Sequence, residues 1–177
     1  MKRLFAALLA ASCLLLPAAA VAGTPEVNAA AALLMEQETG RVLYEKNAHE
    51  KLEPASVTKV MTMLLVMEAL QDGQISLADT VTVSAHAAGM GGSQVYLEEG
   101  ERMSIHDLLK AVAVASGNDA SAALAEHIAG SENGFVELMN RRAAQLGMND
   151  TTFLNCTGLP AKGHVTSAHD IALMSRA

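Results

Sequence analysis

Residues 54–73 read PASVTKVMTMLLVMEALQDG, and this stretch decides the fold. Helix-forming residues run from Ser56 to Gln71, and Gly73 is a natural helix stop. Apolar residues occur on almost every side of the predicted helix: Val57, Val60, Met61, Met63, Leu64, Leu65, Val66, Met67, Ala69 and Leu70. Because a helix that is apolar all round is normally buried, residues 56–71 are predicted to form the centre of the domain.

Around this helix the sequence predicts a β-hairpin, a short strand and four further helices. An apolar run at 29–35 and a strand-like run at 41–45 flank a polar turn, which is typical of a hairpin. The short strand is predicted at 80–83. Serine capping boxes at 104–107 and 167–170 each open a helix. The predicted helices cover 104–115, 119–128, 132–146 and the stretch from 167 onward.

The N-terminus has the layout of a secretory signal peptide. Lys2 and Arg3 precede an apolar run at 4–16 that is too short to span a bilayer. Small residues at 20 and 22 then fit the two positions that a signal peptidase reads. Residues 1–22 are therefore predicted to be a signal peptide, with export of residues 23–177 from the cytoplasm.

Charge and residue types exclude several classes of function. Without the two cations of the signal peptide, 10 of the 12 Lys and Arg remain against 19 Asp and Glu, so no nucleic-acid partner is expected. Cys156 is the single cysteine of residues 23–177, and no internal disulfide is expected. The six histidines form no H-E-x-x-H motif and have no cysteine close enough to suggest zinc. No metal and no cofactor are therefore predicted.

Ser56 and Lys59 form an S-x-x-K motif at the start of the apolar helix. Residues three apart share one helix face, so the hydroxyl and the amine lie within reach of each other. Burial would lower the pKa of Lys59, which would let its amine accept a proton from Ser56. The alternative interpretation is a capping serine followed by a lysine whose amine extends along the apolar surface to solvent.

A second polar motif, Ser116-Gly117-Asn118, lies between two predicted helices. A turn there can project a hydroxyl and a carboxamide into a shared cleft. For an isolated motif, however, a helix-ending glycine and an asparagine cap are the favoured explanation. Penicillin-recognising enzymes carry S-x-x-K, then S-x-N, then K-T-G in this chain order, and the first two occur here in that order.

With these motifs in view, the chain from about Asn28 onward resembles the serine D-Ala-D-Ala carboxypeptidases, which are low-molecular-mass penicillin-binding proteins. Six segments carry the resemblance: LYEKN (43–47), PASVTK (54–59), MGGSQ (90–94), SGNDAS (116–121), LGM (146–148) and NCTGL (155–159). Together the segments are far more specific than any one motif taken singly.

The resemblance implies roles for four side chains. Ser56 would be the acylated nucleophile and Lys59 its general base. Ser116 would relay a proton to the leaving D-alanine, and Asn118 would hydrogen-bond the substrate amide and steady Lys59. The family's substrate is a peptidoglycan stem peptide ending in D-Ala-D-Ala, and β-lactams are its covalent inhibitors. The loop at 91–94 would border the cleft.

The resemblance also implies an α/β fold of the penicillin-binding protein and β-lactamase-like transpeptidase type, which is helix-rich here. No Lys-Thr-Gly occurs in the chain, and in the family this third motif lies on a later strand. We therefore expect the sequence to stop before the strands that carry it, leaving an N-terminal part of the catalytic domain with negligible activity of its own. Membrane attachment is not visible in this part.

Two other functions compete with the carboxypeptidase. A class A β-lactamase shares S-x-x-K but has S-D-N, whereas Gly117 stands here in place of that aspartate. Such an enzyme also needs a glutamate that activates water, and Glu126, Glu132 and Glu137 are the candidates after Ser116. A non-catalytic module that only binds a cell-wall peptide is the third possibility.

Processing of the N-terminus provides the first test. The exported protein is expected to begin at Gly23, and Cys13, an ordinary signal-peptide residue, is expected to carry no lipid. Edman degradation or mass spectrometry of the exported protein checks both points. A protein that begins at Cys13 with a diacylglyceryl mass would contradict them.

Overall fold

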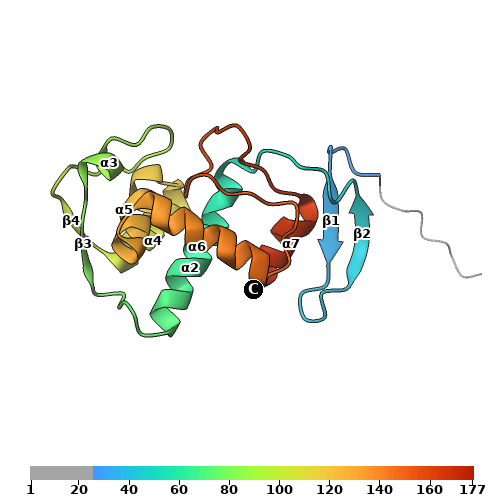
Figure 1. Cartoon of the computed structure of the whole chain (residues 1–177), viewed down its shortest axis with the longest axis horizontal. Helices are drawn as coiled ribbons and strands as arrows, with labels where there is room; N and C mark the ends of the chain where they lie inside the picture. Colours follow the sequence, from blue (N-terminus) through green and yellow to red (C-terminus); the bar gives the residue numbers. More distant parts are fainter. Residues whose placement is uncertain (1–25) are drawn as a thin grey trace, which may run out of the picture.

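The computed structural model describes residues 26–177, so the predicted signal peptide and the expected cleavage site lie outside the described residues. A hairpin lies at one end, a second short strand pair lies at the other, and helices fill the space between them (Figure 1). The elements are β1 (Ala32–Met35), β2 (Val42–Lys46), the 3₁₀ turn η2 (Ala55–Thr58), α2 (Lys59–Gln71), β3 (Thr80–Thr82), α3 (Ala85–Ala88), β4 (Arg102–Ser104), α4 (Ile105–Ala115), α5 (Asn118–Ala129), α6 (Glu132–Gln145) and α7 (Ala168–Arg176).

The predicted central helix is confirmed, with two differences. Its first turn, η2, is a 3₁₀ turn, and the α-helix begins only at Lys59. Met61 and Val66 are fully buried, and α2 contacts α4, α5, α6 and α7. Met67, in contrast, is 54% exposed. The C-terminal half of α2 extends beyond α6 (Figure 1); within it Val66 and Ala69 are buried, whereas Leu70 is half-buried.

Small side chains make α5 the most deeply packed helix of the described part. All eight residues from Asn118 to Ala125 are buried. Four of them are alanines, which let α5 lie close to both α4 and α6. Phe135 and Met139 on α6 fill the remaining space and are fully buried. This packing fixes the start of α5, which carries Asn118.

Serine caps begin α4 and α7 as the sequence predicts. The Ser104 hydroxyl accepts a hydrogen bond from the backbone N–H of Asp107, and Ser167 accepts one from Asp170. Ser131 caps α6 in the same way. Each cap satisfies a backbone N–H that has no partner within its helix.

The strands form two separate antiparallel pairs in the described residues. In the predicted hairpin, Ala32 faces Lys46 and Leu33 faces Glu45. The pairing of β3 with β4 was not predicted, and neither was α3. α7 packs against β1, and its Arg176 guanidinium donates hydrogen bonds to backbone carbonyls of the hairpin turn.

Candidate active site

Ser56 and Lys59 are brought together by the first turn of the central helix. In a 3₁₀ turn, residues i and i+3 lie almost directly above one another, which aligns the two side chains. The Lys59 amine lies 3.2 Å from the Ser56 hydroxyl oxygen. Ser56 is exposed, whereas Lys59 is only 3% exposed. The lysine therefore does not extend to solvent, which excludes the alternative interpretation made from the sequence.

The Lys59 amine has a second partner, the backbone carbonyl of Thr157, at 2.8 Å. Burial lowers the pKa of Lys59, because the charged form loses its hydration. A neutral amine donates one hydrogen bond to this carbonyl and keeps its lone pair free to accept the proton of Ser56. This geometry allows the amine to act as a base toward the hydroxyl.

The turn that carries Thr157 packs directly against the serine. The Asn155 side-chain oxygen accepts hydrogen bonds from the backbone N–H groups of Thr157 and Gly158. Gly158 has a φ of 87°, and a Cβ there would lie 1.8 Å from the carbonyl oxygen of Ala55. Ala55, just before Ser56, has a φ of 44°, which is strained for a residue other than glycine. Only glycine fits this contact.

Ser116 and Asn118 lie at the junction of α4 and α5. Ser116 ends α4 with a φ of 55°, and its hydroxyl is buried without a hydrogen-bond partner among the described residues. A buried polar group without a hydrogen-bond partner is uncommon in folded proteins. The Asn118 side-chain amide donates to the Gly91 carbonyl at 2.6 Å, and its backbone N–H donates to Ser93 at 2.7 Å.

The loop at 91–94 lies between the pair Ser116 and Asn118 and the turn that packs against Ser56. A Cβ on Gly92 would lie 2.8 Å from the Asn118 amide nitrogen and 3.4 Å from the Leu159 side chain. Leu159 directly follows Gly158, so one loop touches both the Asn118 side and the Ser56 side. Within the described residues no hydrogen bond joins Ser116 or Asn118 to Ser56 or Lys59 directly.

Two positioning residues were missed at the sequence level. The fully buried Asp119 carboxylate accepts hydrogen bonds from the backbone N–H groups of Val95 and Leu97, which anchors the loop that follows 91–94. His164 is only 2% exposed, and its Nε2 lies 2.8 Å from the Thr58 hydroxyl oxygen. The position of Asp119 directly after the S-G-N motif was a signal that could have identified it as a site residue. Nothing in the sequence relates His164 to Thr58.

The tautomer of His164 follows from its two contacts. The Leu154 backbone N–H donates to His164 Nδ1, so Nε2 carries the proton and donates to Thr58. Burial lowers the pKa of His164, which favours this neutral form. His164 therefore contacts the η2 turn through the Thr58 hydroxyl.

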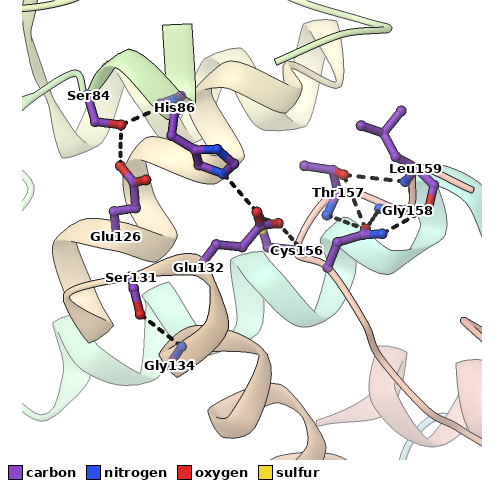
Figure 2. A network of polar contacts seen from close by, with 12 residues as sticks. Ser84, His86, Glu126, Ser131, Glu132, Gly134, Cys156, Thr157, Gly158 and Leu159 are labelled. Atoms are coloured by element: carbon purple, nitrogen blue, oxygen red, sulfur yellow. Dashed lines mark hydrogen bonds and ion pairs between the residues drawn. The ribbon is translucent and has the colours of Figure 1, made fainter. Parts of the chain in front are cut away.

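The three glutamates considered for a β-lactamase all have other partners. Glu126 accepts a hydrogen bond from Ser84 at 2.6 Å. Glu132 contacts His86 and the backbone of Cys156 (Figure 2). Glu137 is exposed and lies 3.8 Å from Arg141. These contacts place none of the three against Ser56.

Residues 26–177 hold neither a metal-binding cluster nor a membrane-spanning helix. No three His, Cys, Asp or Glu side chains of this part gather into a group able to hold a metal ion. None of its helices has the length and the apolar character needed to cross a membrane.

The fold is that of the penicillin-binding proteins. The solved structure of the D-alanyl-D-alanine carboxypeptidase DacD from Francisella tularensis matches with a TM-score of 0.85 at 40% identity, over 86% of this chain and 37% of that one. Penicillin binding protein 5 from Haemophilus influenzae matches with a TM-score of 0.83 at 37% identity, over 86% and 45%. The predicted α/β fold of this type is confirmed.

The family follows from the sequence match. The Peptidase_S11 family, described as D-alanyl-D-alanine carboxypeptidase, matches residues 18–177, and the chain belongs to this family. It is 55% identical over 149 residues to the D-alanyl-D-alanine carboxypeptidase DacF of Bacillus subtilis (strain 168), covering 84% of this chain and 38% of the relative. It is 45% identical to DacC of Escherichia coli (strain K12), covering 86% and 40%. The chain thus spans about two fifths of the length of these curated relatives.

The contact of Gly158 with the Ala55 carbonyl gives a test of the site's architecture. Gly158→Ala is expected to lower the free energy of unfolding by about 1–2 kcal/mol for the left-handed backbone and by roughly 1–3 kcal/mol more for the clash. Gly130→Ala is the matched control, because its φ is 76° but nothing lies within 4 Å of the added Cβ. Urea unfolding measures both variants. If both variants lose the same free energy of unfolding, Gly158 does not lie against the Ala55 carbonyl.

Proposed function

We propose that the protein is a serine D-Ala-D-Ala carboxypeptidase, which removes the terminal D-alanine of peptidoglycan stem peptides through an acyl-enzyme on Ser56. The observation that carries the proposal is a buried Lys59 amine 3.2 Å from the hydroxyl of an exposed serine. Burial makes the amine a base, and exposure makes the hydroxyl accessible to a peptide. Membership of the Peptidase_S11 family supports the substrate class.

The acylation step uses these two side chains directly. Lys59 takes the Ser56 proton while the serine oxygen forms an ester bond with the carbonyl carbon of the penultimate D-alanine. The peptide bond to the terminal D-alanine breaks, and its nitrogen receives the proton by way of Ser116. The unpaired hydroxyl of Ser116 is available for this relay. In deacylation, water attacks the ester, the peptide leaves as a carboxylate, and Ser56 regains its proton.

Binding of the substrate backbone is assigned to Asn118, at the start of α5. Asn118 is held by the carbonyls of Gly91 and Ser93, so its side-chain oxygen is free to accept the substrate amide. The backbone N–H of Ser56 supplies one donor to the developing oxyanion. A β-lactam would acylate Ser56 by the same attack on its ring carbonyl. Residues 1–22 direct the protein to the cell envelope, where peptidoglycan lies.

Covalent labelling tests the nucleophile. In the full-length protein, fluorescent penicillin is expected to label the wild type and to leave Ser56→Ala unlabelled, with unchanged circular dichroism, because the hydroxyl is the point of attachment. Undiminished labelling of Ser56→Ala would refute the assignment. A module that only binds peptides would give no covalent label in either protein. Release of D-alanine from a diacyl-D-Ala-D-Ala peptide, measured beside nitrocefin hydrolysis, separates a carboxypeptidase from a β-lactamase.

The pH dependence of acylation tests the base. Because burial lowers the pKa of Lys59 and the neutral amine is the reactive form, the acylation rate should rise with pH and reach its plateau below lysine's ordinary value of about 10.4. Lys59→Ala should slow acylation by roughly 10²–10⁴-fold and abolish this limb of the profile. Stopped-flow labelling across pH measures both. A midpoint at or above the ordinary lysine value would contradict the role of burial.

A further inference from the structure

Glu132, the first residue of α6, contacts two different segments with its two carboxylate oxygens (Figure 2). One oxygen accepts a hydrogen bond from the Cys156 backbone N–H at 3.0 Å and another from the Cys156 thiol at 3.2 Å. The other oxygen lies 2.9 Å from His86 Nε2. The Glu132 side chain is only 17% exposed. One carboxylate thus joins α3 to the turn at 155–159.

Cys156 is the residue before Thr157, whose carbonyl holds Lys59. The Cys156 carbonyl accepts a hydrogen bond from Thr62 on α2, and the next carbonyl, of Thr157, accepts the one from Lys59. Gly158 then packs against the peptide that precedes Ser56. A displacement of Cys156 would therefore move the partner of the base and the support of the nucleophile together.

The contact with His86 leads toward the loop that holds Asn118. Ser84 caps α3 by accepting a hydrogen bond from the Ala87 backbone N–H, and its hydroxyl donates to Glu126 on α5 (Figure 2). Ser84 therefore ties α3 to α5, and His86 ties α3 to Glu132 on α6. The chain then runs from α3 into the loop at 91–94, whose Gly91 carbonyl accepts the Asn118 amide.

The electrostatics of Glu132 agree with an anchoring role. Burial alone would raise its pKa, but hydrogen bonds from the Cys156 backbone N–H, from His86 and from the Cys156 thiol together lower it. The carboxylate is therefore charged, and charge-assisted hydrogen bonds are stronger than neutral ones. Burial raises the pKa of the Cys156 thiol, which keeps the thiol protonated as a donor.

We infer that Glu132 is a positioning residue for acylation: its carboxylate fixes the turn at 155–159, and with it the Thr157 carbonyl that holds Lys59 beside Ser56. This inference deepens the proposed function and rests on it. Glu132 touches neither the substrate nor the reacting atoms. It acts through the backbone of the turn. Loss of the Glu132 carboxylate should therefore slow acylation more than another substitution that destabilises α6 to the same extent.

The kinetic test compares three variants of the full-length protein. Glu132→Ala is expected to slow acylation by fluorescent penicillin by about 10²-fold, as small displacements of reacting groups commonly do. Glu132→Gln keeps an oxygen that can accept from the Cys156 N–H and should recover most of the rate. Ser131→Ala is the control, because it removes the cap of the same helix without touching the turn, and it should acylate at the wild-type rate.

A second measurement is independent of enzymatic activity. Cys156 is fully buried, so its thiol should resist a disulfide reagent in the wild type and in Ser131→Ala, and should react in Glu132→Ala. Peptide mapping by mass spectrometry identifies the labelled cysteine. If Glu132→Ala acylates normally and keeps Cys156 protected, the inference is wrong. If the wild type itself forms no Ser56 adduct, the proposed function fails instead, and the thiol measurement still decides whether Glu132 holds the turn.

Discussion

The hydrogen bond from the Lys59 amine to the Thr157 carbonyl joins the start of the central helix to a turn 98 residues further along the chain. A buried amine needs such a partner, because an unpaired polar group in an apolar setting is costly. The rest of the site follows from this requirement. The turn must come close enough to present its carbonyl, which demands a glycine at 158, and the α2 side chains around the amine must exclude water.

Much of the local structure could be predicted because its causes are local. Serine caps set the starts of α4 and α7, and the glycines at 130 and 147, both with positive φ, lie just beyond the ends of α5 and α6. The S-x-x-K pair was predictable for the same reason, since three residues of spacing suffice to align its two groups. β4 and α3 are too short to leave a pattern, and each depends on partners distant in sequence.

The positioning residues of the site escaped prediction for a related reason. Asp119 binds backbone groups more than 20 residues earlier, and His164 binds Thr58 across 106 residues. Asp119 directly follows the S-G-N motif, but nothing in the sequence relates His164 to Thr58, and only the fold assigns partners to either residue. The S-G-N motif was different, because its order after S-x-x-K carried information that neither motif has alone. The family match then gave that order its meaning.

Burial of Lys59 also couples the site to folding itself. The unfolded chain exposes this amine to water, where it holds its proton up to about pH 10.4, whereas the folded chain releases that proton at lower pH. Between these two pH values folding expels a proton, so stability increases as pH rises through the window and is lost as pH falls toward the folded-state pKa. Burial of the amine therefore costs conformational stability at every pH below the folded-state pKa, and the same burial lowers that pKa.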